Sequence, residues 1–555
     1  MEKDWWKGKV AYQIYPKSFK DSNGDGIGDL KGITQKLDYL EKLGIDILWL
    51  SPIYKSPFID QGYDISDYYA IDPLFGTMED MEELIAEGKK RGISIIMDLV
   101  VNHCSSHHEW FQKALADPDG PYADYFYFIE SDKEPNNWES YFGGSVWEPV
   151  PGTNKYYLHS FHKDQPDLNW QNPVLREEIY TMINWWLDKG IAGFRIDAII
   201  NIKKDLEWRS LPSDRANGLV PVPESLVNAQ PIEPFLQELK GRTFAKYNAF
   251  TVGEVFNETD EELHFFIGKD GVFSSIFDFK QTMLGQEGKG WFDHTLPTAD
   301  ELKESIFQAH ERADSIGVLS TIIENHDEPR GVSHYIAEGP VNDTSKKALG
   351  TIQVLRKGIP FIYQGQEIGM ENQVFESVED FDDIATINGY HVAKEAGLSE
   401  EEALAAIAKY SRDNARTPMQ WTAEPGLGFS DGPAWLISPK PDYSINVEDQ
   451  EKDPDSILNY YRQLTALYRH PLYGNTIRFG DMIPAYRDRE NIIAFERRGE
   501  KRLLIVSNFQ NRQASLDLPA PIETVILTNV TGLFQEGDQV LELAPYQTIV
   551  LELVE

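Results

Sequence analysis

Short apolar runs alternate with stretches of helical periodicity over most of this chain. The apolar runs predict β-strands at 10–15, 45–50, 93–101, 191–196, 249–252, 274–277, 319–323 and 359–363. Apolar positions recur at helical spacing over 30–43, 78–91 and 177–189. Strands that alternate with helices predict parallel pairing through crossover helices. Eight such strands predict an α/β fold of the (β/α)8 TIM-barrel type.

This alternation is interrupted after the third strand. From about 102 to 172 the chain is rich in Trp, Tyr, Asn, Pro and Gly and has no long helical period, which predicts an inserted region. Beyond about 477, short strands at 492–497, 502–508, 514–518, 524–528 and 548–553 predict an antiparallel β-sandwich. The predicted domains are a barrel at 1–102 and 172–475, an inserted loop-rich domain at 103–171 and a C-terminal β-sandwich at 476–555.

Composition and charge narrow the classes of partner. The formal net charge of −38 argues against nucleic acid and against anionic membranes as partners. No run of about 18 apolar residues is present, so no membrane-spanning segment is expected. Cys104 is the single cysteine, which excludes an intrachain disulfide, and the N-terminus lacks an apolar signal segment. Both features predict a cytoplasmic protein with a buried thiol, and neither indicates an oligomeric state.

Carboxylates and imidazoles follow several of the predicted strands. They lie in the segments Asp98-Leu-Val-Val-Asn-His103, Gly193-Phe-Arg-Ile-Asp197, Thr251-Val-Gly-Glu254 and Glu324-Asn-His-Asp327. All strands of a closed parallel barrel end at one rim, so these groups are expected to face one substrate. A single Asp at a strand end would be interpreted as a structural ion pair. Three acids from three strands favour catalysis instead, and specifically the cleavage of a glycosidic bond.

The three acids are expected to differ in charge state. Asp197 follows Arg195 by two positions, so both side chains point to the same side of a strand, and the guanidinium should keep Asp197 ionised as a nucleophile. Glu254 ends an apolar strand, where burial should raise its pKa and suit it to general-acid catalysis. Asp327, beside His326, could stabilise positive charge on a sugar ring.

The same four segments resemble the signature regions of the α-amylase family, glycoside hydrolase family 13. Gln165-Pro-Asp-Leu-Asn-Trp170 resembles a further region that is typical of the oligo-1,6-glucosidase and α-glucosidase branch. Segments 12–19, 61–65 and 411–421 resemble that branch as well, and the match covers essentially the whole chain in the same order. The resemblance implies Asp197 as nucleophile, Glu254 as general acid/base and Asp327 as transition-state stabiliser.

The resemblance also implies an exo-acting pocket that encloses one terminal glucose of a small oligosaccharide. Asp64 and Arg412 would bind the 4- and 6-hydroxyls, and Tyr63 would stack under the ring. The remaining expected contacts are His103, Arg195 and His326 on the 2- and 3-hydroxyl side, and Phe142 and Phe161 as walls supplied by the inserted domain. For the two phenylalanines, plain packing is an equal alternative.

A polar loop after the first strand is a candidate metal site. Its side-chain oxygens alternate with glycines, as in the first half of an EF-hand loop, but Gly32 stands where the twelfth-position Glu would be. By resemblance it would hold a structural Ca²⁺ through Asp21, Asn23, Asp25, the carbonyl of Ile27, and Asp29. The alternative is a polar turn without metal. No organic cofactor is implied.

Substrate linkage is less strongly marked. In this branch the residue after the nucleophile tracks linkage, and Ala198 favours α-1,4 hydrolysis; an oligo-1,6-glucosidase (isomaltase) is the alternative. Sucrose isomerases share the fold, but their Arg-Leu-Asp-Arg-Asp stretch is replaced here by Phe277-Asp-Phe-Lys-Gln281, which argues for hydrolysis. A trehalose-6-phosphate hydrolase would need cations for the phosphate, for which Lys203, Lys204 and Lys280 are candidates.

A binding scaffold is the alternative from another functional class. Ancillary subunits of amino-acid transporters keep this fold without needing catalysis. They require a membrane anchor, which is not expected here, and this chain carries all three acids.

Overall fold

A computed structural model describes residues 3–215, 217–256, 258–286, 293–337, 339–532 and 534–554. Its central element is a closed barrel with the strand order β1-β15-β14-β13-β12-β10-β5-β2. The strands are β1 (Ala11–Ile14), β2 (Ile47–Leu50), β5 (Ser94–Val100), β10 (Gly193–Asp197), β12 (Phe250–Gly253), β13 (Ser275–Phe277), β14 (Leu319–Thr321) and β15 (Ile359–Tyr363). All eight predicted strands are present, so the TIM-barrel prediction is confirmed.

The chain divides into two compact units, and each is described by itself. The first consists of Met1–Asp4, Trp49–Ala86 and Ser94–Ile276, and the second of Trp5–Leu48, Glu87–Ile93 and Phe277–Glu555. Within the first unit, β10 pairs in parallel with β5 and with β12. Every residue of β10 is buried, the two charged ones included, because a parallel barrel strand is covered on both faces.

Two predicted helices differ in their boundaries from the observed ones, and a residue at the helix end explains each difference. The stretch expected as one helix over 30–43 is divided into α1 (Leu30–Gln35) and α2 (Leu37–Leu43), since Lys36 leaves the helical conformation at φ −103° and ψ 6°. By contrast α3 (Met78–Lys90) follows its prediction closely. Helix α5 (Pro173–Asp188) begins four residues before the predicted start of 177, because Asn172 caps it and Pro173 suits its first position.

The remaining helices and short strands complete both units. In the first unit they are β3 (Tyr54–Lys55), β4 (Asp67–Ile71), α6 (Val222–Ser225), α7 (Glu233–Arg242), α8 (Phe244–Tyr247) and α9 (Asp260–Ile267). In the second unit the helices are α10 (Ala299–Ala313), α11 (Gly331–Tyr335), α12 (Asp343–Leu355), α13 (Ile384–Glu395), α14 (Glu400–Tyr410), α15 (Asp413–Arg416), α16 (Val447–Lys452), α17 (Ile457–Leu467) and α18 (Gly474–Phe479).

The insertion after β5 contains more regular structure than its composition indicates. Helix α4 (Glu109–Ala116) starts it, and β6 (Phe128–Glu130), β8 (Trp147–Pro149) and β9 (Lys155–Leu158) form an antiparallel sheet in the order β6-β9-β8. A second pairing joins β7 (Trp138–Glu139) to β11 (Val220–Pro221). Trp208 and Val222 pack on the hydrophobic cluster of this insertion, so residues well beyond the predicted boundary at 171 contribute to its core.

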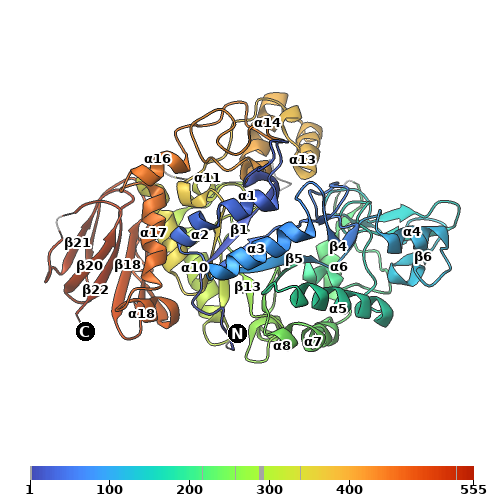
Figure 1. Cartoon of the computed structure of the whole chain (residues 1–555), viewed down its shortest axis with the longest axis horizontal. Coiled ribbons are helices and arrows are strands. Elements are labelled where there is room, and N and C mark those ends of the chain that lie inside the picture. The colour runs from blue at the N-terminus through green and yellow to red at the C-terminus, as the bar shows by residue number, and fades with distance from the viewer. Residues whose placement is uncertain are drawn as a thin grey trace. The chain divides into compact units, whose positions relative to one another are not determined.

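The C-terminal region is a two-sheet structure, as expected. Its strands are β16 (Asp481–Ala485), β17 (Ile492–Arg498), β18 (Arg502–Asn508), β19 (Ala514–Asp517), β20 (Ile522–Thr528), β21 (Val540–Leu543) and β22 (Thr548–Leu553). They form a five-stranded sheet, β16-β17-β18-β22-β20, and the pair β19-β21 (Figure 1). Leu504 and Leu551 of one sheet share a buried cluster with Leu516 and Leu541 of the other. Strands β16 and β21 were not predicted.

Two observations concern the predictions that no segment spans a membrane and that the single thiol is buried. Among the described residues, none of the helices has the length and apolarity needed to cross a membrane. Cys104 is fully buried, and burial raises the pKa of its thiol well above the usual range.

Candidate active site

One guanidinium connects three carboxylates in the first unit. Arg195, on β10, donates from Nη1 to Asp98 Oδ1 at 2.8 Å and to Asp197 Oδ1 at 2.6 Å. Its Nη2 donates to Glu254 Oε1 at 2.7 Å. The strands set this geometry, since Arg195 lies in register with Asp98 on β5 and with Val252 on β12, two residues before Glu254. The contact expected from the spacing of Arg195 and Asp197 is therefore present.

Exposure divides the members of this arrangement into two kinds. The side chains of Arg195 and Asp98 are 1% and 0% exposed, whereas those of Asp197 and Glu254 keep 10% and 12%. The fully buried Arg195 and Asp98 can only orient their neighbours. Asp197 and Glu254 can be reached by a ligand. These two are the acids that the sequence places in the chemical roles.

Asp98 belongs to this group of side chains, although no role was predicted for it. It accepts hydrogen bonds from Tyr63 Oη at 3.0 Å and from Trp49 Nε1 at 3.2 Å. Burial raises the pKa of Asp98, while its ion pair with Arg195 opposes that rise. The Trp49 ring also lies 5.2 Å from the Arg195 guanidinium carbon. The position of Asp98 directly across from Arg195 on the neighbouring strand is the feature that could have identified Asp98.

The turn after Asp197 holds the second oxygen of Glu254. The backbone N–H of Ala198 donates to Glu254 Oε2 at 2.7 Å. Ala198 has φ 44°, a left-handed conformation that is uncommon for a residue with a side chain and that clusters at functional sites. Both oxygens of Glu254 thus accept hydrogen bonds from the protein.

The second unit holds the inverse arrangement, in which several donors serve one carboxylate. Asp327 Oδ1 accepts from Arg416 Nη2 at 2.8 Å and from Arg412 Nη1 at 3.1 Å. His326 Nε2 lies 3.0 Å from Asp327 Oδ2. Arg412 and His326, two predicted binding residues, thus lie beside Asp327. Arg416, for which no binding role was predicted, contacts Asp327 as closely.

These contacts set the charge of Asp327. Its side chain is 33% exposed, and the protein packed around it raises its pKa in part. Contacts with His326 and with the two guanidinium groups outweigh that effect, so the pKa of Asp327 lies well below its usual range. Asp327 is therefore a stable anion.

Arg412 is held by a second carboxylate that sequence reasoning missed. Its Nη2 donates to Asp383 Oδ1 at 2.6 Å and its Nε to the same oxygen at 3.0 Å. Asp383 also caps α13 by accepting from the backbone N–H of Thr386. Burial raises the pKa of Asp383, but Arg412 and Arg416 bring it down to about 2. Asp383 lies in a polar loop without periodicity, so no pattern singled it out.

His103 lies among polar groups supplied by the insertion and by the 60–64 loop. Its Nε2 is 3.1 Å from the carbonyl of Tyr63 and 3.2 Å from Gln165 Nε2. Gln165 donates in turn to Asp60 Oδ2 at 3.0 Å, so Asp60 joins this group without having been predicted. Burial lowers the pKa of His103.

Phe161, one of the two phenylalanines expected as pocket walls, lies beside His103. The Phe161 ring lies 5.0 Å from the His103 ring and 6.0 Å from that of Phe142. Tyr141, which was not predicted, stacks on Phe161 at 4.7 Å with an interplanar angle of 16°. Its hydroxyl donates to Asn201 at 2.9 Å, which connects the insertion to the turn that follows Asp197.

Asp64 accepts several hydrogen bonds from its own loop. It is fully buried, and its carboxylate accepts from the backbone N–H groups of Ile59 and Asp60 at 2.9 and 3.0 Å and from Ser56 Oγ at 3.1 Å. Burial raises the pKa of Asp64 to about 6. These contacts shape the 56–64 loop, and binding of a sugar hydroxyl by Asp64 stays a prediction.

The predicted calcium loop is organised by its own hydrogen bonds. Asp21 Oδ1 accepts from the backbone of Asn23 and Gly24, both at 2.8 Å, and its Oδ2 accepts from Ser430 Oγ at 2.6 Å. Asp29 caps α1 through Gly32 at 2.7 Å. The described part of the chain contains no group of three His, Cys, Asp or Glu side chains arranged to hold a metal ion.

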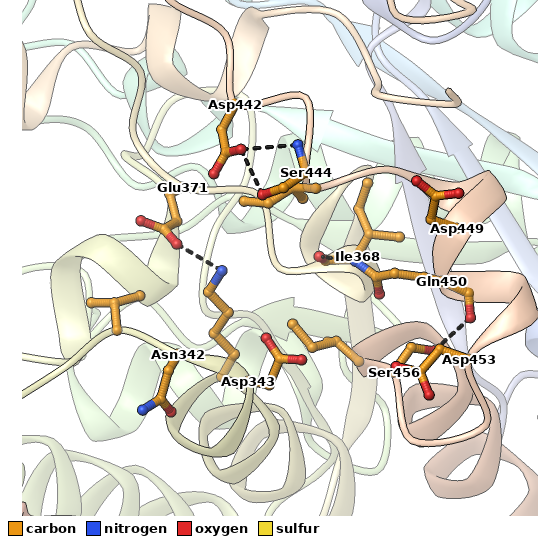
Figure 2. Close-up of a pocket in the computed structure, with 14 residues that line it drawn as sticks. Asn342, Asp343, Ile368, Glu371, Asp442, Ser444, Asp449, Gln450, Asp453 and Ser456 are labelled. Atoms are coloured by element: carbon orange, nitrogen blue, oxygen red, sulfur yellow. Dashed lines mark hydrogen bonds and ion pairs between the residues drawn. The ribbon is translucent and has the colours of Figure 1, made fainter. Parts of the chain in front are cut away.

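A cavity of about 440 Å³ lies elsewhere in the second unit (Figure 2). Its wall carries the carboxylates of Asp343, Glu371, Asp442, Asp449 and Asp453. Glu371 pairs with a lysine of the wall at 2.7 Å, and Asp442 accepts from Ser444. None of its lining residues is a predicted catalytic or binding residue, so this cavity is separate from the groups described above.

Three comparisons relate the chain to known proteins. The family model of the alpha amylase catalytic domain matches residues 13–472. An oligo-1,6-glucosidase of Halalkalibacterium halodurans is 41% identical over 99% of both chains, and a trehalose-6-phosphate hydrolase of Bacillus subtilis is 38% identical over 99% of this chain and 98% of its own. The crystal structure of an isomaltulose synthase from Klebsiella sp. LX3 superposes with a TM-score of 0.94 at 36% identity, covering both chains completely.

Proposed function

This chain belongs to the α-amylase family of glycoside hydrolases, and from that premise we propose that it is an exo-acting, retaining α-glucosidase. It would release glucose from the non-reducing end of short oligosaccharides. The observation that carries the proposal is the Arg195 guanidinium, which holds two accessible carboxylates, Asp197 and Glu254, at the ends of neighbouring barrel strands. A retaining glycosidase requires a nucleophile and an acid in such proximity.

In the first step, a carboxylate oxygen of Asp197 attacks the anomeric carbon while the bond to the leaving oxygen breaks. Glu254 gives its proton to that oxygen, so the aglycone departs as an alcohol. In the second step, Glu254 takes a proton from water, the water oxygen bonds to the anomeric carbon, and the bond to Asp197 breaks. Two inversions give net retention. The anionic Asp327 would stabilise the positive charge that develops on the ring.

Glu254 changes its hydrogen bonds during this cycle. As an anion it accepts from Arg195 and from the N–H of Ala198. The protonated acid keeps acceptor lone pairs on both oxygens, so it can retain these contacts while it also donates its proton to the leaving oxygen. Arg195 contacts Asp98 and Asp197 as well, which favours the ionised form of the nucleophile.

We propose that both terminal α-1,4 and terminal α-1,6 bonds are cleaved. The small side chain of Ala198, directly after Asp197, favours room for an α-1,4-linked sugar. The relative from Halalkalibacterium halodurans is named for α-1,6 activity, which favours the other linkage.

Two features favour free rather than phosphorylated sugars and hydrolysis rather than isomerisation. Of the lysines that could bind a phosphate, Lys204 is buried and paired with Asp167 at 2.9 Å, and Lys203 is paired with Glu262. Neither charge is available without breaking an existing ion pair. The segment after β13 reads Phe277-Asp-Phe-Lys-Gln281 and carries no arginine, unlike the isomerase stretch.

The test compares kcat/KM for maltose, isomaltose and trehalose 6-phosphate at equal concentration. Glucose release from the first two at comparable efficiency is expected. Turnover of trehalose 6-phosphate alone would replace the proposal with a phosphosugar hydrolase. If none of the three is cleaved, the scaffold alternative gains support, because a scaffold would also be indifferent to Asp197→Ala.

Ca²⁺ at the 21–29 loop and a cytoplasmic location remain predictions. A metal that binds only the folded protein raises the unfolding midpoint with concentration. Thermal unfolding with added Ca²⁺ and with a chelator, on the wild type and on Asp25→Asn, measures this. A midpoint that is the same under both conditions would refute the calcium prediction.

A further inference from the structure

Strand β1 supplies no acid to the site, but it places a polar side chain inside the barrel. Gln13 is 1% exposed and lies on β1 in register with Tyr363 of β15. Its Nε2 is 2.8 Å from Nδ1 of His326. Because an unpaired amide in a barrel interior is costly, this contact is a specific feature and not a chance approach.

The chemistry of an imidazole gives this contact a consequence. A neutral histidine carries one N–H and one lone pair on its ring nitrogens, and the partner of one nitrogen decides the state of the other. An amide nitrogen can only donate, so Gln13 requires a lone pair on Nδ1 of His326. The proton then belongs on Nε2, which faces Asp327 Oδ2 at 3.0 Å.

We propose that Gln13 is a positioning residue that holds His326 as the neutral tautomer with its proton on Nε2. The role rests on the proposed function, in which Asp327 stabilises the transition state. A neutral His326 donates a hydrogen bond to Asp327 without cancelling its charge. A doubly protonated ring would form an ion pair with Asp327 and weaken the field that the sugar experiences.

The other groups around His326 fix its plane and its backbone. Tyr15, the first residue after β1, stacks on the His326 ring at 6.1 Å and 20°. Arg416 Nε donates to the His326 carbonyl at 2.9 Å. The charged and titratable groups near the ring include Asp327, Arg412, Arg416, Tyr15 and Asp413, and both arginines disfavour an additional positive charge on the ring.

The experiment replaces the donor by an acceptor and by an apolar group. In Gln13→Glu the new carboxylate accepts from Nδ1, so His326 sits between two carboxylates and takes up a second proton. In Gln13→Leu the donor is lost and the tautomer is no longer fixed. For both variants we expect kcat to fall by about tenfold, the rate factor of one ordinary hydrogen bond, with KM changed much less. For Gln13→Glu we also expect a new ionisation in the pH profile of kcat/KM.

Nitrogen NMR on ¹⁵N-histidine-labelled protein reads the tautomer directly, with His326→Gln for assignment. In the wild type, a protonated Nε2 and an unprotonated Nδ1 are expected, and in Gln13→Glu two protonated nitrogens. The matched control is Gln364→Leu, a second fully buried barrel glutamine, whose Oε1 accepts from the Tyr15 backbone. It should lose stability without acquiring the new ionisation.

Two results would overturn the inference. One is a wild-type His326 with its proton on Nδ1 or on both nitrogens. The other is a pH profile of Gln13→Glu that matches that of Gln364→Leu, which would mean that Gln13 acts only through packing. Absence of glycosidase activity in the wild type would refute the proposed function instead, and the NMR result would still decide the tautomer.

Discussion

Two clusters bury charge in opposite proportions. Around Arg195, one guanidinium serves the three carboxylates of Asp98, Asp197 and Glu254. Around Asp327, two guanidinium groups and an imidazole serve one carboxylate. Both clusters pair arginines with carboxylates, and the ratio of donors to acceptors is what distinguishes them.

That ratio indicates what each cluster can do. A site with more carboxylates than cations readily takes up a proton, because adding one relieves repulsion among the remaining charges. A site with more cations than carboxylates keeps its anion over a wide pH range. The first cluster therefore suits proton transfer and nucleophilic attack, and the second suits a fixed negative charge.

The largest expected effect tests the division of labour inside the first cluster. Asp197→Ala removes the proposed nucleophile and should lower kcat by about 10⁵-fold on 4-nitrophenyl α-glucoside. Azide, which can replace the lost carboxylate, should then yield β-glucosyl azide. In Glu254→Ala, azide should instead intercept the glycosyl-enzyme and yield the α-anomer. Interchanged products would reverse the assigned roles.

Replacing one arginine by methionine in each cluster tests whether the ratio of donors to acceptors sets the loss of stability. Arg195→Met leaves three carboxylates without their shared cation and should reduce the free energy of unfolding by about 3–5 kcal/mol. Arg416→Met removes an equally buried arginine, but Arg412 still serves Asp327, so about 1–3 kcal/mol is expected. Urea unfolding of both variants measures the difference, and equal losses would show that burial, not the ratio, governs the cost.

Redundancy in the second cluster predicts non-additivity. Arg412→Met and Arg416→Met share Asp327 as partner, so each single variant should be buffered by the other arginine. The double variant should exceed the sum of the two single losses by about 0.5–3 kcal/mol. A double-mutant cycle in urea measures this coupling, and a strictly additive result would mean that the two arginines act on Asp327 independently.

Much of this comparison could be predicted from the sequence, but only where periodicity or spacing fixed a position. The eight barrel strands were recognisable as apolar runs, and the i, i+2 spacing put Arg195 beside Asp197. Asp98 begins one of the four recognised segments, but its pairing with Arg195 became clear only from the strand register. Glu254 was expected in an apolar setting, whereas the structure surrounds it with donors from Arg195 and Ala198.

Loops were the least predictable part of the site. Asp60, Asp383 and Arg416 lie outside regular alternation, and their roles depend on contacts with residues far away in the chain. Asp64 belongs to a recognisable motif, yet its carboxylate turns into its own loop. Residue type and spacing locate such a residue on a loop, but the direction of its side chain is decided by backbone donors that no pattern reveals.

A buried histidine outside both clusters should make the stability of the protein sensitive to acid. His334 on α11 is buried, and both its ring nitrogens lack a hydrogen-bond partner among the described residues. Burial, and to a lesser extent nearby His294, lowers the pKa of His334 to about 4. The unfolded chain binds this proton near pH 6.5, so the stability contribution of neutral His334 is complete above pH 6.5 and falls as the pH drops towards 4.

The loss between pH 7 and pH 5 should be about 2 kcal/mol, and His334→Leu should abolish it. Urea unfolding at pH 7 and pH 5 measures the change, with exposed His107→Leu as the control. If the pH dependence of His334→Leu equals that of the wild type, other groups carry the acid sensitivity. At pH 7 the same variant should be at least as stable as the wild type, since it removes two unsatisfied polar atoms.

Cys104 does not have to be removed before the protein is labelled at an introduced cysteine. It is the single thiol of the chain, it is fully buried, and burial raises its pKa, so it exists almost entirely as the unreactive thiol. A cysteine introduced at a surface position such as Val227, which is 87% exposed, would therefore be labelled alone. Conversely, the rate at which Cys104 itself reacts reports how often the chain next to His103 opens to solvent.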